Sequence, residues 1–303
     1  MIFEYALEPQ LLSNWSSFQR LVSLFGIPRG RLISRYPKRW LRLVYDSVPS
    51  GTTEKAKIEI ALKRVERELL LPRNHQWEDS KDWLPNALHE HGRSPFQAIL
   101  ASSSSSICSL VIDATDLDCT DLPLLLKAGP RSIVTRDAAE LGKVLRPLLL
   151  VSKRVLIIEP NFTIKSPRFR EPLSAIAFAA LDLQKRVRVD CDVELHLGMD
   201  KLDEYVDKAA ALDTFLSPQL PEKMAISVTG WNKDDLHNRY VITESFAIML
   251  GEGLGLPDSR SSRPDDVLAL VDEATASELM SRYGNKAKHQ FSHRVVGTKR
   301  LTS

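Results

Sequence analysis

The chain has 303 residues, of which 43% are hydrophobic and 26% are charged. This is the composition of a globular protein that is long enough for two ordinary domains or one large one, and that can bury a core without a disulfide or metal staple. The formal net charge of +2 excludes a uniformly basic surface, so a nucleic-acid contact would have to come from a local patch.

Cysteine usage and hydropathy predict a cytoplasmic protein without a membrane partner. Cys108, Cys119 and Cys191 are odd in number and form no CxxC pair, which favours free thiols in a reducing compartment. Glu4 stands where an export signal would carry positive charge. The best apolar run, Leu145–Val151, is far shorter than the ~20 residues of a membrane span.

Residues 1–105 are predicted to form a helical region. Apolar residues between Leu11 and Phe25 recur at spacings of three and four, which is typical of one helix face, and Gly26 ends that pattern. Further helices are predicted over 37–48 and 52–70, the second with Thr53 as N-cap. The serine run at 102–106 predicts a short flexible joint, and we place the domain boundary there.

Residues 106–303 show the pattern of an α/β domain. Short apolar or alternating segments predict strands, and 3.6-periodic segments between them predict helices. Strands are expected within 108–116, 153–162, 187–197, 224–231, 235–243 and 246–253. Helices are expected over 135–149 with Thr135 as N-cap, 170–186, 202–216 and 264–284, followed by a polar tail. This order predicts a mixed sheet flanked by helices.

The segment from His237 to Gly253 carries the strongest functional pattern. Alternation along a strand would place His237 and Arg239 on one face, where both could contact the same ligand. A neutral imidazole is a nucleophile towards phosphorus, and a guanidinium binds phosphate in a fork. Glu244 at the strand end could orient the imidazole, and Gly251 and Gly253 allow backbone to approach an anion.

The spacing HxRx4Ex6G resembles the HxKx4Dx6G motif of the phospholipase D superfamily. It is most similar to the phospholipase D-like domain at the C-terminus of MIT-domain proteins and of bacterial proteins from defence neighbourhoods. The segment IIEPNF, with Arg168 and Arg170 downstream, resembles a strand and the following arginine of the same domain. The resemblance covers roughly residues 130–260.

This resemblance implies a phospholipase D-like fold and a metal-independent phosphodiesterase or nuclease that acts on nucleic acid in an anti-phage defence system. It implies that His237 attacks phosphorus, that Arg239 holds the non-bridging oxygens and that Glu244 orients the site. Arg168, Arg170, Gly251 and Gly253 would contact phosphate. A second His237 would come from a homodimer mate, partner proteins of a defence complex are possible, and neither a metal nor a cofactor is expected.

The sequence also departs from the family pattern. Arg239 replaces a lysine, Glu244 replaces an aspartate, and Glu159 replaces the aspartate before the strand-end proline. Only one motif is present, whereas an active site of this family needs two. An alternative is therefore a degenerate domain that binds a phosphate ligand or nucleic acid and serves as a sensor or scaffold. His237 could also be an ordinary hydrogen-bonded strand residue.

A second candidate is a basic segment in the N-terminal region. It contains six cations without an intervening acid, and Tyr36 and Trp40 lie between them. Cations neutralise phosphates and aromatic rings can stack on bases, so the segment could contact nucleic acid. It could equally be a solvated or ion-paired surface. The six cations are Arg29, Arg31, Arg35, Lys38, Arg39 and Arg42.

Overall fold

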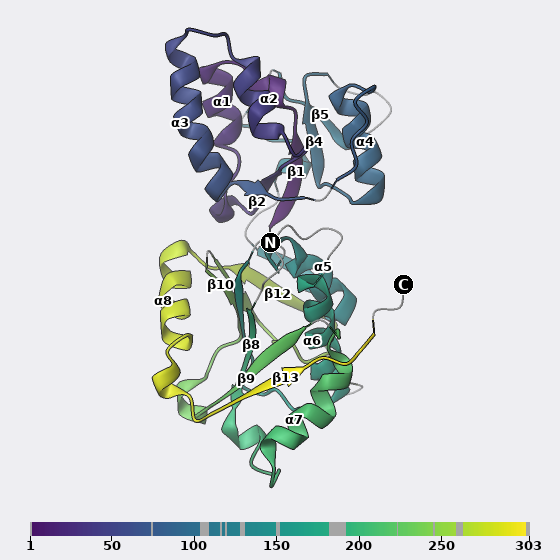
Figure 1. Cartoon of the computed structure of the whole chain (residues 1–303), viewed down its shortest axis with the longest axis vertical. Helices are drawn as coiled ribbons and strands as arrows, with labels where there is room; N and C mark the ends of the chain where they lie inside the picture. Colours follow the sequence, from purple (N-terminus) through teal and green to yellow (C-terminus); the bar gives the residue numbers. More distant parts are fainter. Residues whose placement is uncertain are drawn as a thin grey trace. The chain divides into compact units, whose positions relative to one another are not determined.

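The computed structural model divides the chain into two compact units, Ile2–Gly129 and Pro130–Ser303. Both units are shown in Figure 1. The structure describes residues 2–73, 75–103, 109–115, 117–118, 120–127, 131–149, 152–181, 192–222, 224–244, 246–258 and 263–300. The three cysteines, Cys108, Cys119 and Cys191, lie outside these ranges.

The N-terminal unit is built on a parallel sheet, so the prediction of a helical region over 1–105 is wrong. Five strands lie in the order β3-β2-β1-β4-β5, and every neighbouring pair is parallel. Strands of two to five residues, covered on both faces, carry no alternation, and the sequence pattern alone could not separate them from buried helix. Their bounds are β1 Phe3–Leu7, β2 Arg31–Ser34, β3 Leu70–Leu71, β4 Ala98–Ala101 and β5 Val111–Asp113.

Three helices of this unit lie close to where periodicity predicts them: α1 Trp15–Val22, α2 Trp40–Ser47 and α3 Thr53–Glu68. A fourth helix, α4 Trp83–Arg93, was not predicted from the sequence. The N-cap of α3 is Thr52, whose side chain accepts a hydrogen bond from the amide of Lys55, and not Thr53 as predicted. The strand expected within 108–116 exists as β5, but it belongs to this sheet and not to the C-terminal unit.

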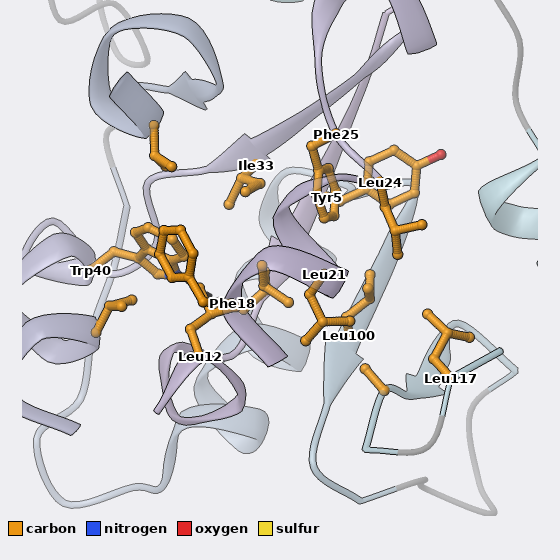
Figure 2. Packing of buried hydrophobic residues seen from close by; sticks show 14 of the residues in the cluster. Tyr5, Leu12, Phe18, Leu21, Leu24, Phe25, Ile33, Trp40, Leu100 and Leu117 are labelled. Carbon is orange, nitrogen blue, oxygen red and sulfur yellow. Dashed lines mark hydrogen bonds between the residues drawn. The ribbon is translucent and has the colours of Figure 1, made fainter. Parts of the chain in front are cut away.

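The apolar face of α1 packs directly against the parallel sheet. Leu21 of α1 lies beside Leu100 of β4 and Phe18 of α1 lies at Trp40 of α2, all within one buried cluster, as Figure 2 shows. The indole of Trp40 is fully buried and donates its N–H to the carbonyl of Leu7 at 2.6 Å. Burial of this indole ring costs little free energy, because its one polar atom, Nε1, keeps a hydrogen-bond partner.

A buried ion network fixes the other face of the sheet. Arg73, just beyond β3, donates to both carboxylate oxygens of Glu4 on β1 at 2.9 Å each, and to Glu90 on α4 at 3.1 Å. Arg93 donates to the same Glu90, whose side chain is fully buried. The largely buried carboxylate of Glu4 and the fully buried carboxylate of Glu90 therefore share the buried guanidinium of Arg73, and Glu90 is also paired with Arg93. The Arg73 guanidinium also lies 4.0 Å from the ring centre of Phe96.

The C-terminal unit contains an eight-stranded mixed sheet in the order β13-β9-β8-β7-β10-β11-β12-β6. The two strands expected within 235–243 and 246–253 are confirmed as β10 and β11, which pair antiparallel to each other. The strand bounds are β6 Arg131–Thr135, β7 Arg154–Ile158, β8 Asp192–Gly198, β9 Ala225–Trp231, β10 Tyr240–Thr243, β11 Ala247–Leu250, β12 Asp265–Leu270 and β13 Phe291–Val296.

Helices cover both faces of this sheet. Figure 1 shows α8 on one side and α5, α6 and α7 on the other. The bounds are α5 Ala138–Leu149, α6 Pro167–Ala180, α7 Lys208–Leu216 and α8 Glu273–Tyr283. Short 3-10 turns occur in the whole chain at Pro9–Leu12, Ile27–Arg29, Leu124–Leu126, Met199–Lys201, Ser217–Gln219, Lys233–Asp235 and Lys286–Lys288. Among the described residues, no helix has the length and apolar character of a membrane span.

Three local predictions for this unit are wrong. Thr135 ends β6, and the carboxylate of Asp137 instead accepts the amide of Glu140 at the start of α5. The first part of the helix expected over 264–284 is β12, and the expected polar tail contains β13. Both strands lie near sheet edges and alternate in burial, with too few apolar residues to stand out in the sequence.

Replacing Arg73 tests the ion network. Arg73→Ala leaves the carboxylates of Glu4 and Glu90 buried without it, and we expect the free energy of unfolding of the N-terminal unit to fall by about 3–5 kcal/mol. Arg64→Ala is the matched control, because its ion pair with Glu68 is exposed and solvent screens it, so its loss should change the free energy of unfolding little. Urea unfolding followed by circular dichroism measures both. Equal losses in the two variants would contradict this account.

Candidate active-edge pocket and its surroundings

One edge of the larger sheet gathers most of the predicted site residues. Strands β7, β8 and β9 are mutually parallel, so their carboxyl ends meet at this edge. Strand β10 is antiparallel to β7, so the chain enters β10 at the same edge, directly after His237–Arg239. Strand β11 leaves at this edge and continues into Gly251–Gly253. In open α/β sheets the carboxyl edge is the usual place for ligands.

The structural centre of this edge is the carboxylate of Glu159, the first residue after β7. It is 1% exposed and accepts hydrogen bonds from the amides of Leu254 at 2.8 Å and Asn161 at 3.3 Å. The Nε atom of Arg239 lies 3.6 Å from Oε1 of Glu159. Burial raises the pKa of Glu159, although the Leu254 amide and the Arg239 charge act in the opposite direction.

The glycine turn after β11 packs directly on this carboxylate. Gly253 has φ +80°, and a Cβ atom there would lie 2.2 Å from Oε2 of Glu159 and 2.4 Å from Cδ of Arg239. A Cβ at Gly251 would lie 2.5 Å from Oδ1 of Asp266, which accepts the amide of Glu252. Both glycines are therefore required by close contact with carboxylates, and Gly253 also by its backbone conformation.

His237 lies at the rim of a pocket of about 190 Å³ at the same edge. The residue is exposed and precedes β10, so it does not take part in the strand alternation that the sequence predicts. The pocket, which we call the His237 pocket, is lined by residues that follow β7, β8 and β9. These residues are Pro160, Asn161, Gly198, Asp200, Lys201, Lys233, Asp234, Leu236 and His237.

The charges of the His237 pocket are two lysines and two aspartates. Lys201 is paired with Asp200 at 2.9 Å, and a Cβ on Gly198 would lie 2.4 Å from that aspartate, so the carboxylate folds back over the end of β8. Lys233 is exposed and forms no ion pair with any residue that the structure describes. The ammonium of Lys233, the imidazole of His237 and the side-chain amide of Asn161 are the groups that could contact an anionic ligand.

The structure does not bring Glu244 to this edge. Glu244 follows β10 and therefore lies at the opposite end of the sheet, where its carboxylate accepts the amides of Lys153 at 2.7 Å and Arg154 at 3.3 Å. It caps the beginning of β7. In this arrangement Glu244 has no contact through which it could orient the imidazole of His237.

The two arginines of α6 hold other parts of the chain. Arg168 donates to the carbonyl of Leu256 and, at 2.8 Å, to Asp258, so it fixes the segment after the glycine turn. Arg170 donates to the carbonyl of Phe215 at 3.4 Å and lies over the ring of the same residue. Arg168 is thus near the glycine turn, whereas Arg170 contacts α7.

Much of the basic segment of the N-terminal unit is engaged within the fold. Arg31 is 6% exposed and donates to the carbonyl of Leu126. Arg35, Arg39 and Arg42 pair with Glu66, Asp79 and Asp46 respectively. Tyr36 and Trp40 are fully buried, so they cannot stack on bases. Of the six cations, only Arg29 and Lys38 are exposed without an ion pair to a described residue.

Sequence reasoning missed Asn161, Lys201 and Lys233 as candidate binding residues. Each follows a different strand, and no short motif connects them along the chain. A usable signal was present, because a polar or charged residue directly after consecutive parallel strands is expected at one common edge. The prediction treated these strands as scaffold and searched for a motif within one segment.

Comparisons with known proteins give little direct guidance. No family model matches the chain, and no curated protein matches it. Among solved structures, Nuc from Salmonella typhimurium, a phospholipase D family member, is 10% identical, covers 53% of this chain and 95% of its own, and has a TM-score of 0.34. The archaeal chromatin protein TrmBL2, described with a novel mode of DNA binding, is also 10% identical, covers 54% of each chain and has a TM-score of 0.28. These TM-scores are too low to assign a shared fold.

Two glycines with the same backbone conformation provide a test of the close packing at this edge. Gly253 and Gly51 have φ of +80° and +77°, but a Cβ at Gly51 would meet nothing within 4 Å. Gly51→Ala therefore reports backbone strain alone, about 1 kcal/mol. Gly253→Ala adds the clash with Glu159 and Arg239, and we expect about 3 kcal/mol in total. Chemical denaturation of the whole chain, followed at the unfolding of each unit, measures the loss in free energy of unfolding for both variants. Equal losses for Gly51→Ala and Gly253→Ala would show that the turn does not pack tightly on Glu159.

Proposed function

We propose that the C-terminal unit binds the phosphodiester backbone of a nucleic acid at the His237 pocket. The observation that carries this proposal is the convergence of Lys233, Asn161 and His237 from separate strand ends on one small hollow. A pocket of about 190 Å³ is smaller than the ~300–1,000 Å³ that encloses a drug-sized ligand. It suits one phosphate group whose flanking nucleotides remain outside, as in a polymer backbone.

The arrangement favours binding over chemistry as the primary role. The guanidinium of Arg239 is partly neutralised by Glu159, and Glu244 lies at the far end of β10. Of the three side chains that the motif would join into one catalytic group, His237 and Arg239 lie at one edge of the sheet and Glu244 lies at the opposite end. Binding of a phosphate requires only the cations of the pocket and an exposed edge of the sheet, so it does not depend on the position of Glu244.

Phosphodiester cleavage is a second candidate, supported by the exposure of His237. Its imidazole stands at the pocket rim and forms no hydrogen bond with a residue that the structure describes, so a phosphorus atom seated in the pocket could be reached. A relation of this unit to the phospholipase D superfamily is part of the same proposal. The homodimer, the cytoplasmic location and the role in anti-phage defence with partner proteins rest on the motif resemblance and stay predictions.

Substitution of Lys233 tests phosphate binding. We expect Lys233→Ala to weaken binding of labelled single-stranded DNA or RNA by about tenfold irrespective of base sequence, and to reduce the slope of log affinity against log salt by about 1. Lys288→Ala is the control, because Lys288 is exposed and lies outside the pocket. Fluorescence anisotropy over a salt series measures both variants. Identical affinities of Lys233→Ala, Lys288→Ala and the native protein for the nucleic acid would contradict the proposal.

Cleavage is tested with the same nucleic acids in EDTA. If His237 is a nucleophile, the native protein cuts without a divalent metal and His237→Ala does not, while both still retain the nucleic acid on a gel. Lack of cutting by the native protein, with retention unchanged, would leave binding as the function of the pocket. Size-exclusion chromatography adds a check, since a mechanism with two His237 side chains requires a dimer.

A further inference from the structure

A second hollow lies on the C-terminal unit and is lined by residues other than those of the proposed phosphate site. Helix α8 covers the sheet face formed by β7, β10 and β11, where the side chains are apolar. On β8, β9 and β13 the same face is polar. Glu194 pairs in register with Ser227, and Thr229 pairs with Ser292. A cavity of about 400 Å³ opens over these residues and shares no lining residue with the His237 pocket.

Glu194 provides a fixed carboxylate in this cavity. Its Oε1 accepts a hydrogen bond from Nε of Arg154 at 2.7 Å. Its Oε2 lies 3.5 Å from Nε2 of the fully buried His196, a nitrogen without a hydrogen-bond partner among the described residues. The indole of Trp231 donates to Nδ1 of His196 at 2.8 Å, so the proton of a neutral ring is on Nε2 and faces Glu194.

The charge state of this carboxylate is set by its two neighbours. Burial alone would raise the pKa of Glu194, but His196 and the Arg154 guanidinium together lower it to about 2. Burial lowers the pKa of His196, so its ring is neutral. Glu194 is therefore ionised at neutral pH, and among the residues that the structure describes Oε2 has one long contact, to His196 at 3.5 Å. An ionised oxygen of this kind is a strong acceptor for ligand hydroxyl groups.

The opposite wall of the cavity is formed by the segment between α8 and β13. Lys286 is exposed and lines the cavity together with His289. The Nε2 atom of His289 lies 3.4 Å from the carbonyl of Tyr283, at the end of α8. Phe291 is also a lining residue, but it pairs with Gly230, so its ring leaves the sheet on the other face. The cavity thus combines a carboxylate, hydroxyl groups, one imidazole ring and an ammonium.

We propose that this cavity, which we call the Glu194 cavity, binds a phosphorylated ribose, either as a sugar phosphate or within a nucleotide. The ribose hydroxyls would donate to Glu194 and hydrogen-bond with Ser227 and Thr229, in the way a carboxylate receives a ribose diol in nucleotide-binding proteins. The phosphate would lie at Lys286. A nucleobase, if present, would lie against the ring of His289. A volume of about 400 Å³ is within the range of small-ligand pockets.

Calorimetric titration with four probes tests this site on the whole chain: AMP, deoxy-AMP, ribose 5-phosphate and inorganic phosphate. We expect AMP or ribose 5-phosphate to bind at least tenfold more tightly than inorganic phosphate, and AMP to bind about tenfold more tightly than deoxy-AMP. Tight binding of ribose 5-phosphate equal to that of AMP identifies a sugar phosphate as the ligand, and preference for AMP identifies a nucleotide.

Variants assign the binding to this cavity. Lys286→Ala should weaken AMP or ribose 5-phosphate about tenfold, while Lys288→Ala, two residues further along the same turn, should not. Lys233→Ala should also have no effect, which separates this site from the His237 pocket. Glu194→Gln should remove the preference for AMP over deoxy-AMP. If that variant misfolds, the Lys286 and Lys288 pair decides the question. No binding of any ribose phosphate, or equal binding to the Lys286→Ala protein, would overturn the proposal.

Discussion

The carboxyl edge of the larger sheet depends on one buried carboxylate. Glu159 directly follows β7, and its two carboxylate oxygens accept hydrogen bonds from the backbone amide of Leu254 in the glycine turn and from that of Asn161 in its own loop. Arg239 lies against it at the entrance to β10. Three segments that are distant in sequence are thereby held at one point. Because His237 is two residues from Arg239, the position of the pocket rim follows from this contact. A carboxylate is well suited to this role, since it accepts several hydrogen bonds at once.

The same constraint explains why a linear motif describes this site only in part. A strand of four residues, Tyr240–Thr243, separates Arg239 from Glu244, and the chain therefore delivers the two side chains to opposite edges. The spacing of the motif was visible in the sequence, and so was the strand pair that carries it. The direction in which each residue leaves the sheet was not, because that depends on pairing with β7. Asn161, Lys201 and Lys233 meet only after β7, β8 and β9 align.

The predictability of the fold followed the length and pattern of each element. Helices α1 to α3 were predicted from apolar spacing, and β5 and β7 to β11 from apolar or alternating runs. Strands β1 to β4 of the N-terminal sheet were missed because they are short, and because β2 and β4 are buried along their whole length, which erases the two-residue period. The basic segment illustrates the same limit for surfaces. Its arginines looked unopposed along the chain, yet Glu66 and Asp79, distant in sequence, pair with two of them in the folded unit.

The most direct measurement is an NMR titration of the histidine ring resonances with a short single-stranded oligonucleotide. The chain contains seven histidines, so each ring can be followed separately. The account predicts that the resonances of His237 shift and saturate together with binding, whereas His293, which is paired with Asp213 at 3.0 Å away from the pocket, stays unchanged. Binding of the oligonucleotide without any change at His237 would contradict the assignment of the phosphate site to this edge of the sheet.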